Sequence, residues 1–175
     1  HAIAHGANSP KGKLRGATQL FCYGTCSFYT NPVQGSVKLT DIQAEDFFPG
    51  IRQNLYAFYT ASLWAELTTK TYGSGGDSAP LFRLLLGSLR LLDAGLAKPG
   101  RAELISIQFL WRFLALAGLA PELSTCAECG QDLGRCGEWA YDFTESGVLC
   151  GECRPAGGAT AAAAQLNKGA LEYLR

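Results

Sequence analysis

Four of the seven cysteines have the spacing of metal ligands. Cys126 and Cys129 form one Cys-x-x-Cys step, Cys150 and Cys153 form a second, and twenty residues separate the two steps. Each step brings two thiolates close enough to share one metal ion, and a loop of about 15 to 20 residues between two such steps is typical of zinc sites. The spacing therefore predicts one structural zinc ion per chain, bound by these four thiolates.

A structural zinc fits this set better than a catalytic one, because four thiolates leave no coordination position open for water. A zinc deaminase also needs a His-x-Glu sequence ahead of its Cys-x-x-Cys, and neither His1 nor His5 is followed by such a glutamate. The alternative to a metal site is a set of buried cysteines or a disulfide pair. Cys136 has no partner at ligand spacing, and we interpret it as a residue that does not bind the metal.

The residues between the two steps indicate a small zinc ribbon. Their larger side chains are spaced as in two short strands: Trp139, Tyr141, Phe143 and Val148. Three glycines give the backbone freedom where the chain turns sharply: Gly130, Gly147 and Gly151. We therefore expect the cysteines to lie at the turns of a compact β unit.

Composition and charge limit the class of protein. The 175 residues are 47% hydrophobic, which allows one or two domains with a core, and an odd cysteine count with a metal site favours a reducing compartment. No apolar run is long enough to span a membrane. The formal net charge is zero, but residues 1–40 have no acidic residue and four basic ones: Lys11, Lys13, Arg15 and Lys38.

The N-terminal residues predict a small antiparallel β domain with strands at 2–4, 19–30 and 33–40. A basic, glycine-rich loop at 6–16 is either a solvated connection or a contact for a phosphate backbone. Cys22 and Cys26 are expected to be small core residues, because a second metal site would need His1 and His5 from a separate segment. Of the aromatic residues that could stack on bases, we expect at least half in the core: Phe21, Tyr23, Phe28 and Tyr29.

The pattern changes at Asp41, and three helices are predicted at 51–72, from Pro80 to about Gly95, and at 101–118. The third is apolar nearly all round, so we expect it to be central. Residues 155–164 are low in complexity and predict a surface connection, and residues 166–174 predict a last helix that returns to the bundle. No P-loop, nucleophile elbow or paired catalytic carboxylates are present, so the sequence gives no positive case for an enzyme.

These pieces resemble the RecO family of bacterial recombination mediators. The specific part is a succession of three motifs: Phe109-x-x-Arg112-x-Leu114, Gly118-x-x-Pro121 and Cys126-x-x-Cys129-Gly130. Further matches lie along nearly the whole chain: Gly6-Ala7 with the basic loop to Arg15, Glu66-Leu67, Leu81-Phe82 with Leu85, Leu89 and Leu92, and Gly147-Val148-Leu149-Cys150. The OB-fold of that family begins with further strands that this chain lacks.

The resemblance implies an α+β, mainly helical protein. Its predicted parts are a partial OB-fold-like β-barrel domain at 1–45, a helical bundle at 46–120, a zinc-binding insertion with four cysteine ligands at 121–156, and a linker with a returning helix at 157–175. It implies a non-enzymatic protein of the bacterial cytoplasm that binds and anneals single- and double-stranded DNA and loads RecA on gapped DNA with RecR and, in many bacteria, RecF. The resemblance also implies that the single-stranded DNA-binding protein is a partner.

Particular residues are predicted to contact DNA and the single-stranded DNA-binding protein. The candidate DNA-binding residues are four cations: Lys11, Lys13, Arg15 and Lys38. Cationic loops suit the phosphates of a nucleic acid, and the aromatic faces of an OB-type barrel suit its bases. Arg112 is a candidate at the rim of a groove between helices that receives the apolar, carboxylate-terminated tail of the single-stranded DNA-binding protein; the alternative is an arginine that caps or pairs within the bundle. A zinc-stabilised adaptor without nucleic-acid binding and a zinc enzyme remain the alternatives.

Overall fold

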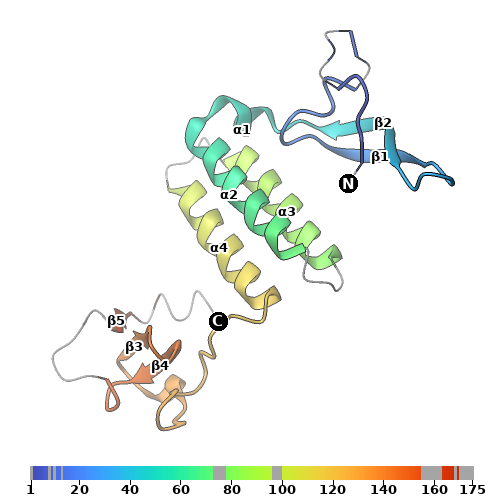
Figure 1. Cartoon of the computed structure of the whole chain (residues 1–175). Coiled ribbons are helices and arrows are strands. Elements are labelled where there is room, and N and C mark those ends of the chain that lie inside the picture. Colours follow the sequence, from blue (N-terminus) through green and yellow to red (C-terminus); the bar gives the residue numbers. More distant parts are fainter. Residues whose placement is uncertain are drawn as a thin grey trace. The chain divides into compact units, whose positions relative to one another are not determined.

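The structure is a computed structural model that describes residues 2–7, 9, 11–12, 14–72, 78–95, 100–154, 163–167 and 169. The chain forms two compact units, residues 1–106 and 107–175 (Figure 1). The predicted α+β class is confirmed, and the described strands form two small antiparallel sheets and no closed barrel. The predicted four-part domain organisation stays a prediction.

The first unit begins with a hairpin of β1 (Tyr23–Thr30) and β2 (Val37–Asp46). Asn31 forms the tip, where its Oδ1 accepts hydrogen bonds from the backbone N–H groups of Val33 (2.9 Å) and Gln34 (3.2 Å). Side-chain to backbone bonds of this kind stabilise a turn, so pairing starts on either side of it. The predicted strands are therefore wrong at residues 19–22 and 33–36, which form turns and loop, and β2 continues past Asp41.

Three helices pack together in the same unit: α1 (Pro49–Gln53), α2 (Leu55–Tyr72) and α3 (Ala79–Gly95). The single helix predicted from residue 51 to 72 is wrong, because Asn54 is extended and its Oδ1 accepts from the N–H of Ala57 (3.0 Å), which caps α2. Ala57, Ala61 and Trp64 recur at helical spacing and are fully buried. They form the core of this unit with Leu92 of α3, which is also fully buried.

A hydrogen bond connects α1 to α3, and a buried aromatic residue connects it to β2. The N–H of Ile51, a helix-start donor without a partner inside α1, donates to Asp93 Oδ1 of α3 at 2.9 Å. Phe48 joins β2 to α1 with a left-handed backbone (φ 44°) while its side chain is 1% exposed. A bulky residue adopts that conformation only where packing enforces it, so Phe48 fixes the direction in which α1 leaves the hairpin.

Helix α4 (Arg101–Leu116) differs from the prediction. Its buried residues form one line along the helix: Ala102, Ile105, Phe109 and Phe113. Leu104, Ile107 and Leu116 are about half exposed (47–51%), so the expectation of a helix buried on all sides is wrong. None of the described helices has the length and apolarity that a membrane span requires.

The second unit holds a three-stranded antiparallel sheet in the order β4-β3-β5, with β3 (Trp139–Asp142), β4 (Gly147–Cys150) and β5 (Ala163–Leu166). Asp142 closes the β3–β4 turn, because its Oδ1 accepts from the N–H groups of Thr144 (2.7 Å) and Glu145 (3.3 Å). Strands β3 and β4 confirm the predicted ribbon. Two predictions are wrong at strand β5. Leu166 belongs to this strand and not to a helix, and Ala163 is buried and not part of a surface connection. Residues 155–162 and 170–175 of these two predicted segments lie outside the described residues.

Candidate metal centre

The four predicted ligands come together at one end of the second unit. The Sγ atoms of Cys126, Cys129, Cys150 and Cys153 all lie within 4.8 Å of one another, and they are the one such group among the residues that the structure describes. The Sγ atoms of Cys129 and Cys150 are 3.8 Å apart. Zn–S bonds of about 2.3 Å in a tetrahedron place sulfur atoms about 3.8 Å apart, whereas a disulfide bond is about 2.05 Å long. The arrangement fits a metal bound by four thiolates and not a disulfide pair.

The first step is a tight turn between Cys126 and Gly130. The N–H of Gly130 donates to the carbonyl of Cys126 (2.9 Å), and the N–H of Cys126 donates to the carbonyl of Gln131 (2.8 Å). Gly130 has a positive φ of 73°, a conformation that costs other residues energy. The glycine after the first Cys-x-x-Cys therefore lets the chain fold back over its own cysteines.

The second step begins where β4 ends. The N–H of Ala127 donates to the carbonyl of Val148 (2.9 Å), and the N–H of Cys150 lies 3.4 Å from Cys126 Sγ. These contacts hold the two Cys-x-x-Cys steps side by side without any contribution from a metal bond. A Cβ added to Gly147 would lie 2.6 Å from Ala127 Cβ, so only glycine allows β4 to approach the first step this closely.

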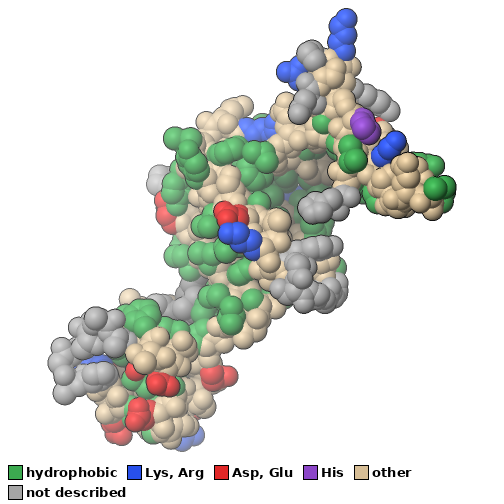
Figure 2. Space-filling view, viewed as in Figure 1, with side chains coloured by type: hydrophobic (Ala, Val, Ile, Leu, Met, Phe, Trp, Pro, Cys, Tyr) green, Lys and Arg blue, Asp and Glu red, His purple; other side chains and the backbone are tan. Residues whose placement is uncertain are grey.

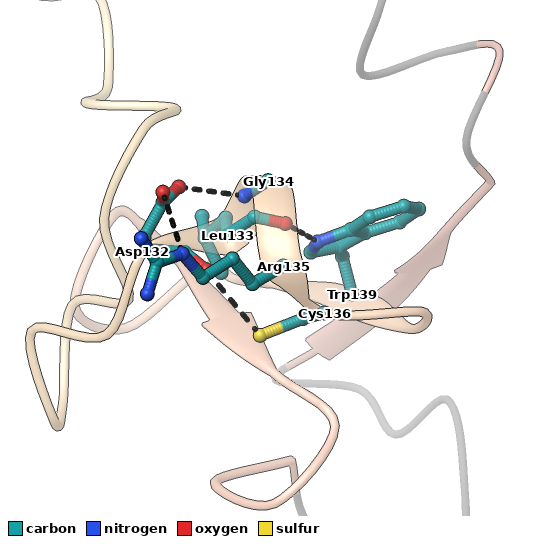
Figure 3. A network of polar contacts seen from close by, with 6 residues as sticks. All are labelled: Asp132, Leu133, Gly134, Arg135, Cys136 and Trp139. Carbon is teal, nitrogen blue, oxygen red and sulfur yellow. Dashed lines mark hydrogen bonds and ion pairs between the residues drawn. The ribbon is translucent and has the colours of Figure 1, made fainter.

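A small core lies under the cysteines. It consists of buried residues from the two steps, from the loop between them and from the segment before them: Leu123, Cys126, Leu133, Trp139, Val148, Leu149 and Cys150. The indole N–H of Trp139 donates to the buried carbonyl of Leu133 (2.9 Å), which is fixed by the short helix η1 (Leu133–Arg135) (Figure 3). Asp132 caps η1 by accepting from the N–H of Gly134 (2.8 Å). The loop between the two steps is thus a packed structure.

Cys136, the cysteine predicted not to bind, packs against this core. Its thiol lies 3.6 Å from the carbonyl oxygen of Asp132 (Figure 3) and is not part of the four-sulfur group. Burial raises the pKa of the Cys136 thiol, and the neighbouring Cys150 thiol adds to this effect. Its position, outside the group of four sulfur atoms, is what distinguishes Cys136 from the candidate ligands.

Electrostatics distinguish two of the thiols, those of Cys126 and Cys153. Burial disfavours the Cys126 thiolate, but hydrogen bonds from backbone N–H groups at Cys129, Cys150 and Glu128 outweigh this effect and lower its pKa to about 6. The pKa of Cys153 is raised, first because of its hydrogen bond with Cys129 and then because of Cys150. Without metal, Cys126 is therefore the first of the two thiols to ionise. Four thiolates around one ion leave no open position, so this centre is suited to holding the fold together and not to activating water.

The other cysteine pair does not form a core site. Cys22 is half-buried, whereas Cys26 is exposed on β1, so the expectation that both are core residues is wrong for Cys26. Burial raises the pKa of the Cys22 thiol, with the charge of Arg52 opposing the shift. Of the two histidines considered as ligands with them, His5 belongs to no group of metal-binding side chains and His1 lies outside the described residues.

The candidate DNA-binding cations lie in the first unit. Lys11, Arg15 and Lys38 are exposed, and Lys13 lies outside the described residues. Between them, buried Leu14 (6% exposed) anchors the basic loop. The guanidinium of Arg52 donates to the Gln19 side chain (2.7 Å) and to the Leu20 carbonyl (2.6 Å), and this fastens the end of the loop to α1.

The four aromatic candidates divide into two pairs. Phe21 packs edge-on against Phe58, with ring centroids 5.4 Å apart, and Tyr23 lies 6.3 Å from Phe82. Phe28 and Tyr29 are instead 57% and 53% exposed. Two of the four rings are thus available for contact with another molecule.

A small apolar pocket lies between the hairpin and the helices of the first unit. It has a volume of about 180 Å³ and is lined by Phe21, Cys22, Tyr23, Phe48, Ala65, Phe82, Leu85, Leu86 and Leu89. The guanidinium carbon of Arg90 lies 5.3 Å from the Tyr23 ring centroid, beside this pocket. Arg112 is exposed on α4 and is not among the lining residues. No pattern in the sequence predicted this pocket.

Comparison with known proteins identifies the family of this chain. The family model described as "Recombination protein O C terminal" matches residues 52–175. A DNA repair protein RecO from Desulfatibacillum aliphaticivorans is 32% identical over 155 residues, which cover 87% of this chain and 59% of that protein. A DNA repair protein RecO from Pelotomaculum thermopropionicum is 32% identical over 174 residues, which cover 99% of this chain and 63% of that protein.

A third DNA repair protein RecO, from Desulforamulus reducens, is 28% identical over 151 residues, or 86% of this chain and 56% of that protein. The chain thus spans 56% to 63% of the length of these relatives. The family model covers well over half of the chain, and its match includes all four clustered cysteines. The chain belongs to the RecO family.

Proposed function

We propose that this chain is a non-enzymatic, DNA-binding part of a bacterial recombination mediator. In this role it binds single- and double-stranded DNA in the cytoplasm, helps complementary strands to anneal, and acts with RecR and RecF to load recombinase on gapped DNA. Membership of the RecO family supports a role in DNA repair. The four-thiolate centre acts as a structural zinc site, because a closed site stabilises the fold without taking part in chemistry.

The distribution of charge carries the DNA-binding proposal. Residues 1–106 include ten basic and seven acidic residues (net +3), whereas residues 107–175 include five basic and eight acidic ones (net −3). On the face shown in Figure 2, Lys and Arg side chains gather around the N-terminal residues, and Asp and Glu side chains around the second unit. A polyanion is therefore attracted to the first unit, and most of all to its acid-free residues 1–40.

A titration with fluorescent single-stranded DNA at two salt concentrations tests this proposal. Neutralising Lys11, Lys13 and Arg15 together should flatten the dependence of log affinity on log salt by about 0.7 for each phosphate that is no longer bound. The matched control removes three exposed cations elsewhere, in Lys70→Gln, Arg83→Gln and Arg135→Gln, and should change the slope little. If both triple variants bind like the wild type, the basic loop is a solvated connection; if wild-type binding shows no salt dependence, the adaptor alternative is correct.

The apolar pocket favours a second candidate function, docking of the tail of the single-stranded DNA-binding protein. The pocket offers apolar walls for an apolar chain end, and the cation of Arg90 beside it suits a terminal carboxylate. Calorimetry with a tail peptide and with its C-terminal amide tests both elements. Arg90→Ala should weaken binding of the carboxylate peptide only. Arg112 is no part of this pocket and stays a separate prediction, which unchanged peptide affinity in Arg112→Ala would contradict. Absence of wild-type binding would overturn the pocket proposal.

A further inference from the structure

Three exposed side chains of different chemistry form a row across the tip of the β1–β2 hairpin. Tyr29 pairs with Lys38 across the two strands, and Lys38 pairs on its other side with Ile3. Residues directly opposite each other in a sheet point to the same face, with Cβ atoms about 5 Å apart in an antiparallel pair. Ile3 and Tyr29 are both 53% exposed, and Lys38 between them is exposed as well. One face thus presents an aromatic ring beside a cation.

The backbone under this row is fixed on both sides. The N–H of Ile3 donates to the carbonyl of Val37, and the N–H of Leu39 donates to the carbonyl of Ile3, both at 2.9 Å. At the tip, the N–H of Asn31 donates to the carbonyl of Ser36 (2.9 Å), in addition to the turn that its side chain closes. The ring and the ammonium group therefore start from a defined spacing, which lowers the entropy that binding must remove.

Single exposed hydrophobic residues are common and need no explanation. Here the exposed ring has a cation directly opposite it, and the described strand residues from Phe28 to Leu39 include no acid; the first acidic residue of β2 is Asp41. Phe28 pairs with Leu39 and so points to the opposite face. The face with Tyr29 and Lys38 is therefore complementary to a ligand that combines a flat apolar surface with a negative charge.

We propose that Tyr29 and Lys38 form a contact for single-stranded DNA, in which the ring stacks on an unpaired base while the ammonium group binds a neighbouring phosphate. This inference rests on the proposed DNA-binding function and refines it. Bases in a duplex are stacked on one another and do not offer a free face, whereas every unpaired base does. The hairpin therefore favours single strands, while the cations of the basic loop act on the phosphates of either form.

The test compares variants of the 175-residue chain on an oligo-dT strand and on a duplex of the same length. Tyr29→Leu removes the ring but keeps an apolar side chain, and it should weaken single-strand binding about 5- to 150-fold, which corresponds to about 1 to 3 kcal/mol per stacked base. Duplex binding and the single-strand salt slope should stay unchanged. Lys38→Gln should instead reduce the salt slope by about 0.7 on the single strand.

Two controls distinguish the removal of the stacking ring from damage to the fold. Phe143→Leu removes a ring that is 59% exposed on the acidic unit, and it should leave binding unchanged. Tyr29→Phe and Tyr29→Trp keep a ring at the same position and should retain single-strand affinity. If these two variants also lose affinity, or if Tyr29→Leu weakens single-strand and duplex binding equally, the stacking contact is refuted.

The inference and the proposed function fail in different ways. If the wild-type chain binds neither DNA with salt dependence, the proposed function fails and the stacking contact fails with it. If the wild type binds both DNAs and Tyr29→Leu matches it on both, only the stacking contact is overturned. A preference for the single strand that disappears in Tyr29→Leu and returns in Tyr29→Trp supports both.

Discussion

Replacing Cys150 by serine tests directly whether the four clustered cysteines bind the metal. Cys150 is 1% exposed, its Sγ lies 3.8 Å from that of Cys129, and its N–H faces Cys126 Sγ. Structural zinc sites contribute about 10 to 16 kcal/mol of apparent binding energy, so one of four equal ligands accounts for about 3 kcal/mol. This corresponds to a loss of about 150-fold in apparent metal affinity.

The assay is competition with a chromophoric chelator at constant pH, together with metal analysis after gel filtration. Cys136→Ser is the matched control, because it makes the same substitution in the same unit at a thiol outside the four-sulfur group. We expect one zinc ion per chain in the wild type and in Cys136→Ser, and a large loss in Cys150→Ser. Equal losses in the two variants, or a fully folded wild type without metal, would refute the assignment of the ligands.

Two further predictions concern the same unit. In the metal-free chain, the ultraviolet absorbance of thiolate should show one thiol ionising near pH 6, and Cys126→Ser should abolish that step. Because protons compete with the metal for the thiolates, metal affinity should fall as the pH is lowered, which the chelator assay measures at several pH values. Gly147→Ala should cost about 1 to 3 kcal/mol in urea unfolding of the metal-loaded chain, because its Cβ meets that of Ala127 at 2.6 Å. Ala127→Gly should restore most of that loss, and an equal cost in both backgrounds would contradict the packing argument.

The cluster of four cysteines was predictable from the sequence because its geometry is local. A Cys-x-x-Cys step closes within one turn, and alternation between Trp139 and Val148 reports the two strands that carry the second step. Gly130 was predictable for the same reason, since its positive φ belongs to the turn that it closes. The spacing did not show that Ala127 and Gly147 approach each other, because that contact joins residues far apart in the chain.

The sequence-based predictions are wrong where a residue distant in the chain, or a single helix cap, decides the local structure. Asn54 lies inside an apolar helical period, and one side-chain hydrogen bond to Ala57 divides that run into α1 and α2. Leu166 has a helical pattern around it but pairs with Trp139 of β3. The pocket combines four separate stretches of the chain, near residues 22, 48, 65 and 85, so no local pattern indicates it.

The β3–β4 hairpin also bears on the order in which this unit assembles. Its strands are joined by the short turn that Asp142 closes, so all its contacts are close in sequence. Hairpins of this kind form in about 1 to 10 μs, because little loop entropy opposes their closure. Cys150 therefore reaches its place opposite Trp139 early, and the edge of β4 offers the carbonyl of Val148 as the acceptor for the N–H of Ala127. We expect the second pair of cysteines to be organised first and the first pair to be captured onto it, with the metal entering last.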